Sequence, residues 1–512
     1  MGIAEPDQGV IAGERGRGEG VHTAATVEAS LPVRAVLREA GFRLFWTGQT
    51  ISLIGSQVSL VALPLLAVLT LDAGPFEVGL LAALGRAPWL LFGLLAGALA
   101  DRARRRPLLV AADLVRAAVL AWIPVAAWLG VLTVGQLYAV TFVVGTMTVL
   151  SEVAAQSFLP SLAAPAQLAD GNGKLEVSRA SAEAVGPGLG GVLVQAVTAP
   201  FAIVADVVSF LLSATLLGRL KVDERTGPDG AGALPGTGAG AASATGPGAG
   251  PGTIAGSIVP TAPGTPTAST SASATASTRA SVAGSVAGEM REGLRFVLGH
   301  PLLRWNVLAA AVANFFGNIL LAILVLYVLT ELRLAPAVIG LVLGLGSLGA
   351  VLGAAVAQRL IRRAGYGPTL TAGLAVTAAG GLLLAPVDGP YALRVAWAVA
   401  ALMLLLGGVP LFDVAVVTLR QLITPPRILG RANATMRFLV FGTMPLGALA
   451  GGLLGDHAGL RTAVLVAGAG LAVPVILVLV SPLARLRSHL PPSMAAFDRP
   501  SPITIPGGNN DH

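Results

Sequence analysis

Acidic and basic side chains occur inside stretches of the sequence that are otherwise apolar, and these residues are the best suited to chemistry. Glu152 lies in MTVLSEVAAQSFLP, Asp206 in FAIVADVVSFLL and Arg86 in AALGRAPWLL. A charge in apolar surroundings costs several kcal/mol unless it is paired or protonated. These three residues are therefore candidates for ion pairing or reversible proton binding, and Asp206 is the acid we expect to partner Arg86 or to take up a proton.

Asp113 and Arg116 form a second charged constellation, in AADLVRAAV. Residues three apart share one face of a helix, so these two can contact each other. Two interpretations stay open. The pair either neutralises itself locally or belongs to a larger network of charges at the cytoplasmic side.

Several kinds of chemistry are disfavoured by what the chain lacks. It has no cysteine, so disulfides, thiolate metal sites and thiol nucleophiles are absent. Its five histidines lie in tails or near expected helix ends without metal-ligand spacing. There is no GxxxxGK[ST] loop to bind ATP. We expect no metal, no catalytic residues and no cofactor.

The composition indicates which elements carry these residues. Only 12% of the residues are charged and the mean hydropathy is +0.79, whereas soluble domains carry roughly 25% charged residues. Apolar runs of about 20 residues recur, and each is long enough to cross the roughly 30 Å hydrocarbon core of a lipid bilayer. The sequence therefore predicts an all-α polytopic membrane protein.

The apolar runs predict twelve transmembrane helices divided six and six. The expected spans are 44–70, 78–99, 107–129, 134–159, 176–197, 200–218, 303–330, 336–358, 367–386, 391–419, 432–454 and 460–482. They form two bundles, 44–218 and 291–484. A Gly-, Ala-, Ser- and Pro-rich segment, 219–290, is expected to be a disordered linker, and 1–43 and 485–512 are expected to be tails. After the linker, GEMREGLRFVLGHPLLRW is expected to form an amphipathic helix along the membrane surface.

Basic residues alternate between the predicted loops. Arginines and lysines gather before the first span and after the second, fourth, sixth, eighth, tenth and twelfth spans, whereas the other loops carry essentially Arg333, Arg394 and Arg461. Basic residues mark the cytoplasmic side of a membrane protein. Both termini and the linker are therefore expected in the cytoplasm, and the net charge of +7 reflects topology rather than nucleic-acid binding.

The two halves contain an internal repeat. The segment that begins SEVAAQSFLP is echoed by the one that begins FDVAVVTLRQ, which aligns Glu152 with Asp413 and Asn172 with Asn433. A gap of three residues then aligns Pro187 with Pro445. Two parallel six-helix repeats are typical of alternating-access transporters.

With these features in place, the chain resembles the major facilitator superfamily over nearly its whole length. GALADRARRRPLL resembles the gating-loop signature of that family, and the matching residues are Gly97, Asp101, Arg102, Arg105 and Arg106. AVGPGLGG resembles the helix-packing motif of its antiporter branch, and the matching residues are Gly186, Pro187, Gly190 and Gly191. FRLFWTGQTISLIGSQ and LEVSRASAEAVGPGLGG are most similar to the enterobactin-exporter and macrolide-efflux-like subgroup.

The resemblance implies a monomeric secondary transporter in the cytoplasmic (inner) membrane. It implies efflux of a moderately hydrophobic small molecule, such as an antibiotic, natural product or siderophore, driven by the proton gradient. The span-four signature of drug antiporters, which carries an arginine, is absent. Two other classes remain as alternatives, a membrane-embedded lipid-modifying enzyme and a non-transporting sensor or scaffold. The residues expected to line the transport cavity are Gln49, Ser52, Ser56 and Gln57.

Glu152 and Asp413 are expected to act as latch acids at the cytoplasmic end. Glu152 lies about 18 residues, or roughly 27 Å, into its span, which places it near Arg105. Asp413 occupies the equivalent place in the second half, near Arg359, Arg362 and Arg363. Paired with these basic residues, the acids would favour the state closed inside. The alternatives are that Glu152 carries the proton or that it contacts only water.

Overall fold

The computed structural model describes residues 36–102, 104–163, 167–220, 291–424 and 426–486. Within these ranges every regular element is a helix, so the predicted all-α polytopic fold is confirmed. The linker and tail expectations for 1–35, 221–290 and 487–512 fall outside the described residues.

The N-terminal half follows the order expected from its apolar runs. Its helices are α1 (Ala40–Leu71), α2 (Pro75–Arg102), α3 (Arg105–Trp128), α4 (Val134–Phe158), α5 (Leu168–Val197), α6 (Ala199–Ala202) and α7 (Val204–Gly218). The C-terminal half repeats this order after a short helix over residues 291–299. Its longer helices are α9 (Pro301–Thr330), α10 (Pro336–Ala364), α11 (Tyr366–Leu384), α12 (Tyr391–Ile423), α13 (Pro426–Phe441), α14 (Thr443–Ala458), α15 (Leu460–Gly470) and α16 (Ala472–Val480).

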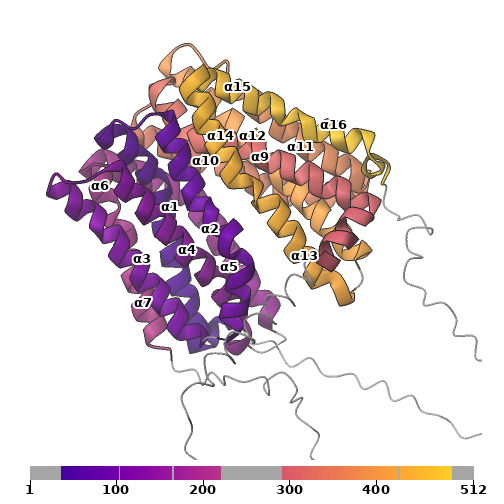
Figure 1. The fold of residues 1–512 in the computed structure, drawn as a ribbon, viewed down its shortest axis with the longest axis horizontal. Helices are drawn as coiled ribbons and strands as arrows, with labels where there is room; N and C mark the ends of the chain where they lie inside the picture. The colour runs from indigo at the N-terminus through magenta and orange to yellow at the C-terminus, as the bar shows by residue number, and fades with distance from the viewer. Residues whose placement is uncertain (1–35, 103, 164–166, 221–290, 425, 487–512) are drawn as a thin grey trace, which may run out of the picture.

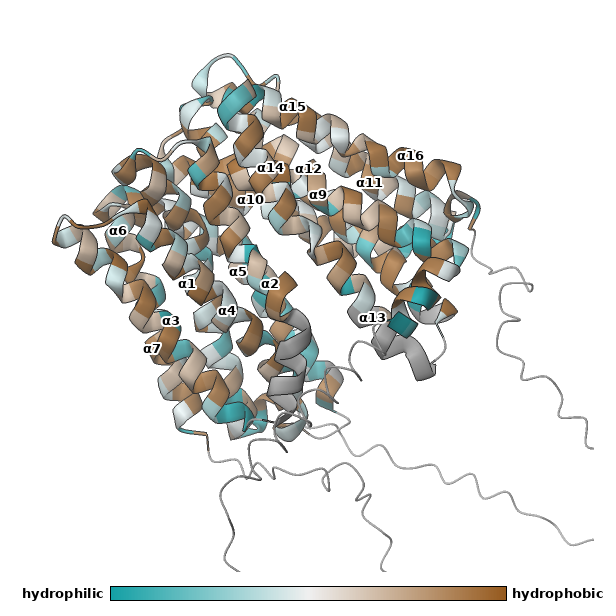
Figure 2. Cartoon of the chain, viewed as in Figure 1, coloured by the Kyte–Doolittle hydropathy of each residue, from teal (hydrophilic) through white to brown (hydrophobic). Residues whose placement is uncertain are grey.

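Ten of the described helical segments are long and apolar enough to cross a membrane. The helices α2 and α5 have 28 and 30 residues, which is also enough to cross. The described helices therefore fit the predicted twelve spans. Large apolar side chains face outward around them, such as Trp128 (78% exposed) and Val480 (68% exposed), and the ribbon coloured by hydropathy is brown over most of its length (Figure 2). This surface suits lipid tails.

Three of the predicted spans are interrupted rather than continuous, and two of the breaks lie close to prolines. The span expected at 200–218 is divided into α6 and α7 at Ile203. The span expected at 432–454 consists of α13 and α14, with a break at Gly442, and the span expected at 460–482 consists of α15 and α16, with a break at Leu471. Proline has no N–H to donate and its ring clashes with the carbonyl four residues before it. Pro445 disturbs the helix at Phe441 in this way and Pro474 disturbs it at Gly470, so each break lies one residue beyond the clash.

The contacts between the two halves in the described structure are concentrated at one end of the molecule. We call this the hairpin end, because α1 turns into α2 there at Asp72–Gly74, and we call the other end, where α1 begins and α7 ends, the tail end. The ribbons of the halves converge at the hairpin end and diverge toward the tail end (Figure 1). The contacts between halves are made chiefly by α5 with α10 and by α2 with α14.

Glycines allow these helices to approach closely at the hairpin end. A Cβ placed on Gly191 of α5 would lie 3.0 Å from the Cα of Gly340 on α10, and one placed on Gly79 of α2 would lie 2.7 Å from the backbone nitrogen of Gly452 on α14. Gln195 also accepts a hydrogen bond from the backbone N–H of Ala337, at 3.2 Å. The hairpin end is therefore sealed by backbone-to-backbone packing.

The predicted helix-packing motif divides between two neighbours. A Cβ on Gly190 would lie 3.1 Å from the Cα of Val58, and Gly186 abuts the side chain of Gln57, so both face α1. Gly191 faces α10 of the other half. Pro187 lies within α5 without interrupting it, and its carbonyl oxygen approaches Gly340.

Gly191→Ala is expected to destabilise the protein, whereas Gly188→Ala is not. The added methyl at position 191 meets the backbone of α10, and overpacking of this kind typically costs about 1–3 kcal/mol. A Cβ on Gly188 meets nothing within 4 Å, and alanine favours a helix by up to about 1 kcal/mol over glycine. Thermal unfolding of the two purified variants in the same detergent measures the difference. Equal melting temperatures would contradict the close-packing role of Gly191.

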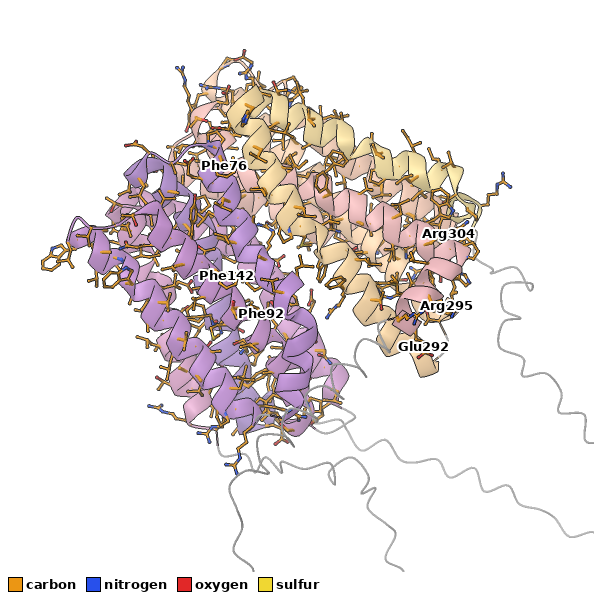
Figure 3. All side chains as sticks on the ribbon, in the orientation of Figure 1. Phe76, Phe92, Phe142, Glu292, Arg295 and Arg304 are labelled. Atoms are coloured by element: carbon orange, nitrogen blue, oxygen red, sulfur yellow. The ribbon has the colours of Figure 1, made fainter. Side chains whose placement is uncertain are left out.

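The helix over residues 291–299 has an apolar and a polar face. Gly293 and Val297 are buried, whereas Arg291, Glu292 and Arg295 are exposed. Glu292 and Arg295, with Arg304 at the start of α9, lie at the tail end of the C-terminal half (Figure 3). The amphipathic pattern expected from the sequence is present at this position.

Candidate functional site

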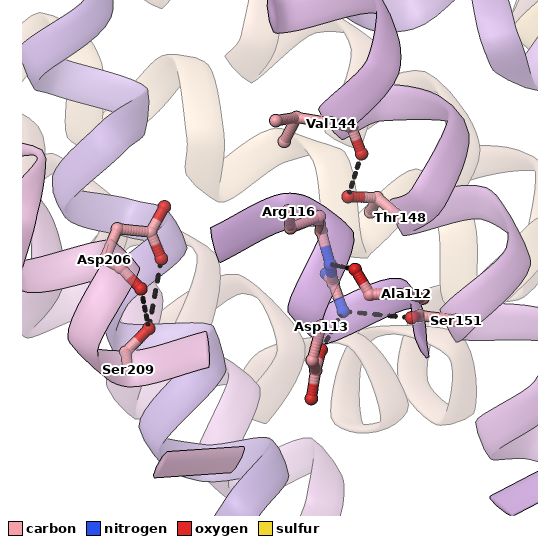
Figure 4. Close-up of polar contacts among 8 residues, drawn as sticks. All are labelled: Ala112, Asp113, Arg116, Val144, Thr148, Ser151, Asp206 and Ser209. Atoms are coloured by element: carbon pink, nitrogen blue, oxygen red, sulfur yellow. Dashed lines mark hydrogen bonds and ion pairs between the residues drawn. The ribbon is translucent and has the colours of Figure 1, made fainter. Parts of the chain in front are cut away.

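A buried ion pair lies within the N-terminal half. Asp113 and Arg116, one turn apart on α3, form a salt bridge, with side chains 2% and 7% exposed. Arg116 also donates to the hydroxyl of Ser151 on α4, at 2.9 Å, and its guanidinium lies 4.2 Å from the ring centroid of Phe210 on α7. The arginine therefore ties α3 to both neighbouring helices (Figure 4).

Asp206 is buried beside this pair, in the first turn of α7. One carboxylate oxygen accepts a hydrogen bond from Ser59 of α1 at 2.5 Å, and the other accepts one from Ser209 at 3.1 Å. A Cβ on Gly55 of α1 would lie only 2.7 Å from the carboxylate. The absence of a side chain at Gly55 therefore makes room for Asp206 against α1.

The buried charges do not balance. Arg116 is within electrostatic range of both Asp113 and Asp206, and all three side chains lie in the core. One guanidinium compensates one carboxylate, so ionising both acids leaves an uncompensated negative charge in apolar surroundings, which is costly. Asp113 contacts the arginine directly, whereas the hydrogen bonds of Asp206 come from hydroxyl groups. Asp206 is thus the acid better placed to bind a proton.

Arg86 is not the partner of Asp206. Its guanidinium donates to the carbonyl of Ala82 on its own helix at 3.4 Å, and the residues in contact with Asp206 come from α1, α7 and the neighbourhood of Arg116. The physical reason is packing. Helix α2 contacts α4 and α14, whereas α7 contacts α1 and α3.

Glu152 lines a cavity of about 500 Å³ at the tail end of the N-terminal half. The other residues that line it come from α1, α4, the turn that follows α4, and α5: Phe45, Gln49, Leu53, Ala155, Gln156, Leu159, Asn172, Gly173, Leu175, Glu176 and Arg179. The lining combines carboxylates, amides and an arginine with apolar side chains. Such a mixture suits an amphipathic small molecule.

The cations near Glu152 differ from those expected. Arg179, Arg437 and Arg116 lie within electrostatic range of its carboxylate, and Arg105 is not among them. Asp413 is likewise within range of Arg420, rather than of Arg359, Arg362 or Arg363, whose side chains are exposed at the end of α10. Depth in the membrane was predicted for both acids, but the neighbouring helix that faces each of them depends on the packing.

The predicted gating loop is described only in part. The backbone of α2 is helical through Gly97, Asp101 and Arg102, but their side chains fall outside the described structure. Arg106 donates through Nε to the carbonyl of Leu217 at 3.0 Å and also donates to the carbonyl of Gly218. A cation suits the C-terminal end of a helix, where carbonyls are unpaired, so Arg106 joins α3 to the end of α7.

The expected cavity residues on α1 occupy different environments. Gln49 lines the cavity described above. Ser52 is buried, and Ser56 and Gln57 are half-buried, with Gln57 packed against Gly186 of α5. Ser59, three residues after Ser56 on α1, donates a hydrogen bond to Asp206.

Comparison with solved structures shows the same fold in several transporters. A bacterial homologue of the iron transporter ferroportin, in an inward-facing state, aligns with a TM-score of 0.61 and 17% identity over 87% of this chain and 99% of that one. The nucleoside transporter NupG aligns with a TM-score of 0.61 and 11% identity over 86% and 98%. A bacterial homologue of the human lysosomal transporter Spinster, inward-facing and unoccupied, aligns with a TM-score of 0.58 and 13% identity over 91% and 99%.

The TM-scores show a shared fold. No curated protein matches the chain. The family model described as transmembrane secretion effector matches residues 32–229 and 268–503, which is more than half of the sequence. The chain therefore belongs to the transmembrane secretion effector family, within the major facilitator superfamily of membrane transporters.

Proposed function

We propose that this protein is a secondary active transporter that exports a moderately hydrophobic small molecule in exchange for protons. The single observation that carries proton coupling is the buried set of two carboxylates, Asp113 and Asp206, around one guanidinium, Arg116. Taking up a proton at Asp206 neutralises the excess charge, and releasing it restores the charge. A buried group whose charge changes in this way can favour different packings of the helices around it.

The arrangement of the two halves supports alternating access as the mechanism. The hairpin end is closed by the contacts of α5 with α10 and of α2 with α14, whereas the tail end diverges (Figure 1). The cavity that Glu152 lines is at the tail end. An exporter must load its cargo from the cytoplasm, so we assign the tail end, with both termini, to the cytoplasmic side of the cell membrane, in agreement with the arginine pattern of the loops.

This orientation predicts which introduced cysteines can be labelled in intact cells. The chain contains no native cysteine, so single-cysteine variants need no further substitution. Cysteine at Val131, which is 50% exposed at the hairpin end, should react with a membrane-impermeant maleimide added outside. Cysteine at Arg295, exposed at the tail end, should react only after the cells are opened. The reverse pattern would invert the proposed transport direction.

The cargo class is tested by a screen followed by a transport assay. We expect a strain that expresses the protein to tolerate higher concentrations of at least one compound from a panel of antibiotics, toxic natural products and siderophores. That compound should accumulate in inverted vesicles when a proton gradient is imposed, and an uncoupler should abolish the accumulation. Accumulation that survives the uncoupler would contradict proton coupling. Failure of every compound to enter proteoliposomes by counterflow would contradict a transport function for the compounds tested.

A further inference from the structure

Arg86 carries a charge near the middle of the membrane that the proton-binding site does not use. It lies eleven residues, or roughly 16 Å, after Pro75 at the start of α2, which is about half of the roughly 30 Å hydrocarbon core. Its guanidinium has five N–H donors, and its one hydrogen bond to a described residue is the 3.4 Å contact with the carbonyl of Ala82 on its own helix. No described carboxylate lies within 4.0 Å of it. An unpaired charge at this depth is costly and marks a functional position.

Arg86 faces the C-terminal half. One turn before it, Ala83 belongs to a small apolar cluster with Ala322 of α9. One turn after it, the ring of Trp89 makes an edge-to-face contact with Phe441 of α13, with 6.0 Å between the ring centroids. Residues three apart share one helical face. Arg86 therefore lies between these two contacts, on the face of α2 that meets the other half.

Asn318 of α9 lies at the same level in the opposite half. It precedes Ala322 by one turn, and Arg86 follows Ala83 by one turn. Because α9 runs toward the hairpin end and α2 runs away from it, both steps lead toward the tail end. The side chain of Asn318 is 4% exposed, and its amide nitrogen donates to the carbonyl of Asn314 at 2.8 Å. Its amide oxygen is buried and accepts no hydrogen bond, which is unusual and costly in a folded protein.

There is space beside these two side chains. A Cβ on Gly317, next to Asn318 on α9, would meet nothing within 4 Å. The side chains of Arg86 and Trp89 are half-buried rather than enclosed. Arg86 lies seven residues beyond Gly79, whose packing on α14 helps to seal the hairpin end, and the halves diverge toward the tail end (Figure 1). A small molecule that enters from the open tail end can therefore reach this level.

We infer that Arg86 and Asn318 form the cargo-binding site, and that the cargo is an aryl carboxylate with a hydrogen-bond donor on its ring. The forked guanidinium matches the two oxygens of a carboxylate. The amide oxygen of Asn318 accepts the hydrogen bond from the donor. The aromatic pair of Trp89 and Phe441 flanks the ring of the cargo. This inference rests on the proposed transport function and names its cargo as an organic anion.

The same arrangement explains how the site would select its cargo. Arg86 comes from the N-terminal half and Asn318 from the C-terminal half, and each has unused hydrogen-bonding capacity. A molecule that lacks either the carboxylate or the donor leaves one of these groups unpaired. Sites built in this way reject analogues that lack the matching polar group, because the unpaired group of the protein makes binding costly.

The role of the charge is tested by binding of benzoate and of benzamide, its uncharged counterpart. Ligand-observed NMR with the purified full chain in nanodiscs of zwitterionic lipid measures both affinities. Benzoate should bind about 10- to 150-fold more tightly, the range for hydrogen bonds to a charged group. Arg86→Gln should lose this preference. Arg86→Lys should keep part of it, because an ammonium keeps the charge without the fork. Arg304→Gln, which removes an exposed arginine from the first turn of α9, should keep all of it.

The role of the amide oxygen is tested with the ortho, meta and para hydroxybenzoates. The isomer that places its hydroxyl against Asn318 should bind about 2- to 10-fold more tightly than benzoate, as expected for a neutral hydrogen bond. Asn318→Leu keeps the size of the side chain and removes the acceptor. It should cancel this gain and leave the preference for benzoate over benzamide unchanged.

Three results would overturn the site. They are equal affinity for benzoate and benzamide, including no binding of either, a preference for benzoate that survives Arg86→Gln, and a hydroxyl gain that is absent or survives Asn318→Leu. Each result compares two probes on one protein, so a loss of folded material affects both alike. Because the readout is binding, the site can be confirmed where no compound is transported. Proton-driven export of a compound without an acidic group would refute the site and leave the proposed function standing.

Discussion

Arg116→Ala is expected to be the most destabilising single substitution in the N-terminal half. It removes the salt bridge to Asp113, the hydrogen bond to Ser151 and the contact with the ring of Phe210. It also leaves two carboxylates buried without a counter-charge. Removing one partner of a buried ion pair typically costs about 3–5 kcal/mol, most of it from the charge left behind. Thermal or denaturant-induced unfolding of the purified variant measures the loss.

The source of this cost can be separated by partner substitutions. Asp113→Asn added to Arg116→Ala should recover part of the lost stability, because it removes one of the stranded charges. Arg104→Ala is the control, since Arg104 precedes α3 and is exposed, and it should unfold as the unmodified protein does. If Arg116→Ala and Arg104→Ala unfold alike, the buried pair does not stabilise the fold. If Asp113→Asn gives no recovery, the cost arises from lost packing on Phe210 instead.

The helices of this fold could be predicted from local sequence patterns. A helix that crosses a bilayer must satisfy its own backbone hydrogen bonds and present apolar side chains to lipid, so apolar runs of the right length predicted the helices well. The Asp113–Arg116 contact was predictable for the same reason, because three residues of spacing place both side chains on one helical face. Local geometry alone decides such features.

Contacts between helices were less accessible from the sequence. The depth of Asp206 in the membrane was compatible with a partner on any neighbouring helix, and only the packing of α7 on α1 places it beside Ser59 rather than Arg86. A usable signal was present in α1. Gly55 and Ser59, four residues apart on one face, mark where another helix approaches closely and offers something to hydrogen-bond.

The residues around Glu152 could not be predicted for the same reason, because one of them belongs to the other half of the molecule. The length of α4 fixed its level near the tail end, but Arg437 comes from the opposite bundle. The sequence of the N-terminal half alone cannot identify a partner of Glu152 that belongs to the C-terminal half. The internal repeat could have done so, because the offset that pairs the prolines also pairs Arg179 with Arg437. Symmetry between repeats is therefore a better guide to the facing charges than depth alone.

Asp206→Asn is expected to abolish gradient-driven transport while leaving exchange intact. Asparagine has nearly the shape of aspartate, and its one amide oxygen can still accept a hydrogen bond from Ser59 or from Ser209, but it cannot bind and release a proton. A membrane potential is worth about 2.3 kcal/mol per charge per 100 mV, which sustains about 50-fold accumulation for each proton exchanged. Without the carboxylate that accumulation should fall to no enrichment. Counterflow, which needs no net proton movement, should persist.

Two further variants show whether this result belongs to Asp206 in particular. Asp388→Asn removes an exposed carboxylate from the loop between α11 and α12 and should keep full accumulation. Asp113→Asn leaves one carboxylate, Asp206, beside one guanidinium, Arg116. It removes the excess negative charge and should therefore weaken coupling as well. If Asp206→Asn still accumulates the compound with unchanged pH dependence, Asp206 is not the proton-binding acid. Unchanged coupling in Asp113→Asn would show that the charge balance around Arg116 does not set the protonation of Asp206.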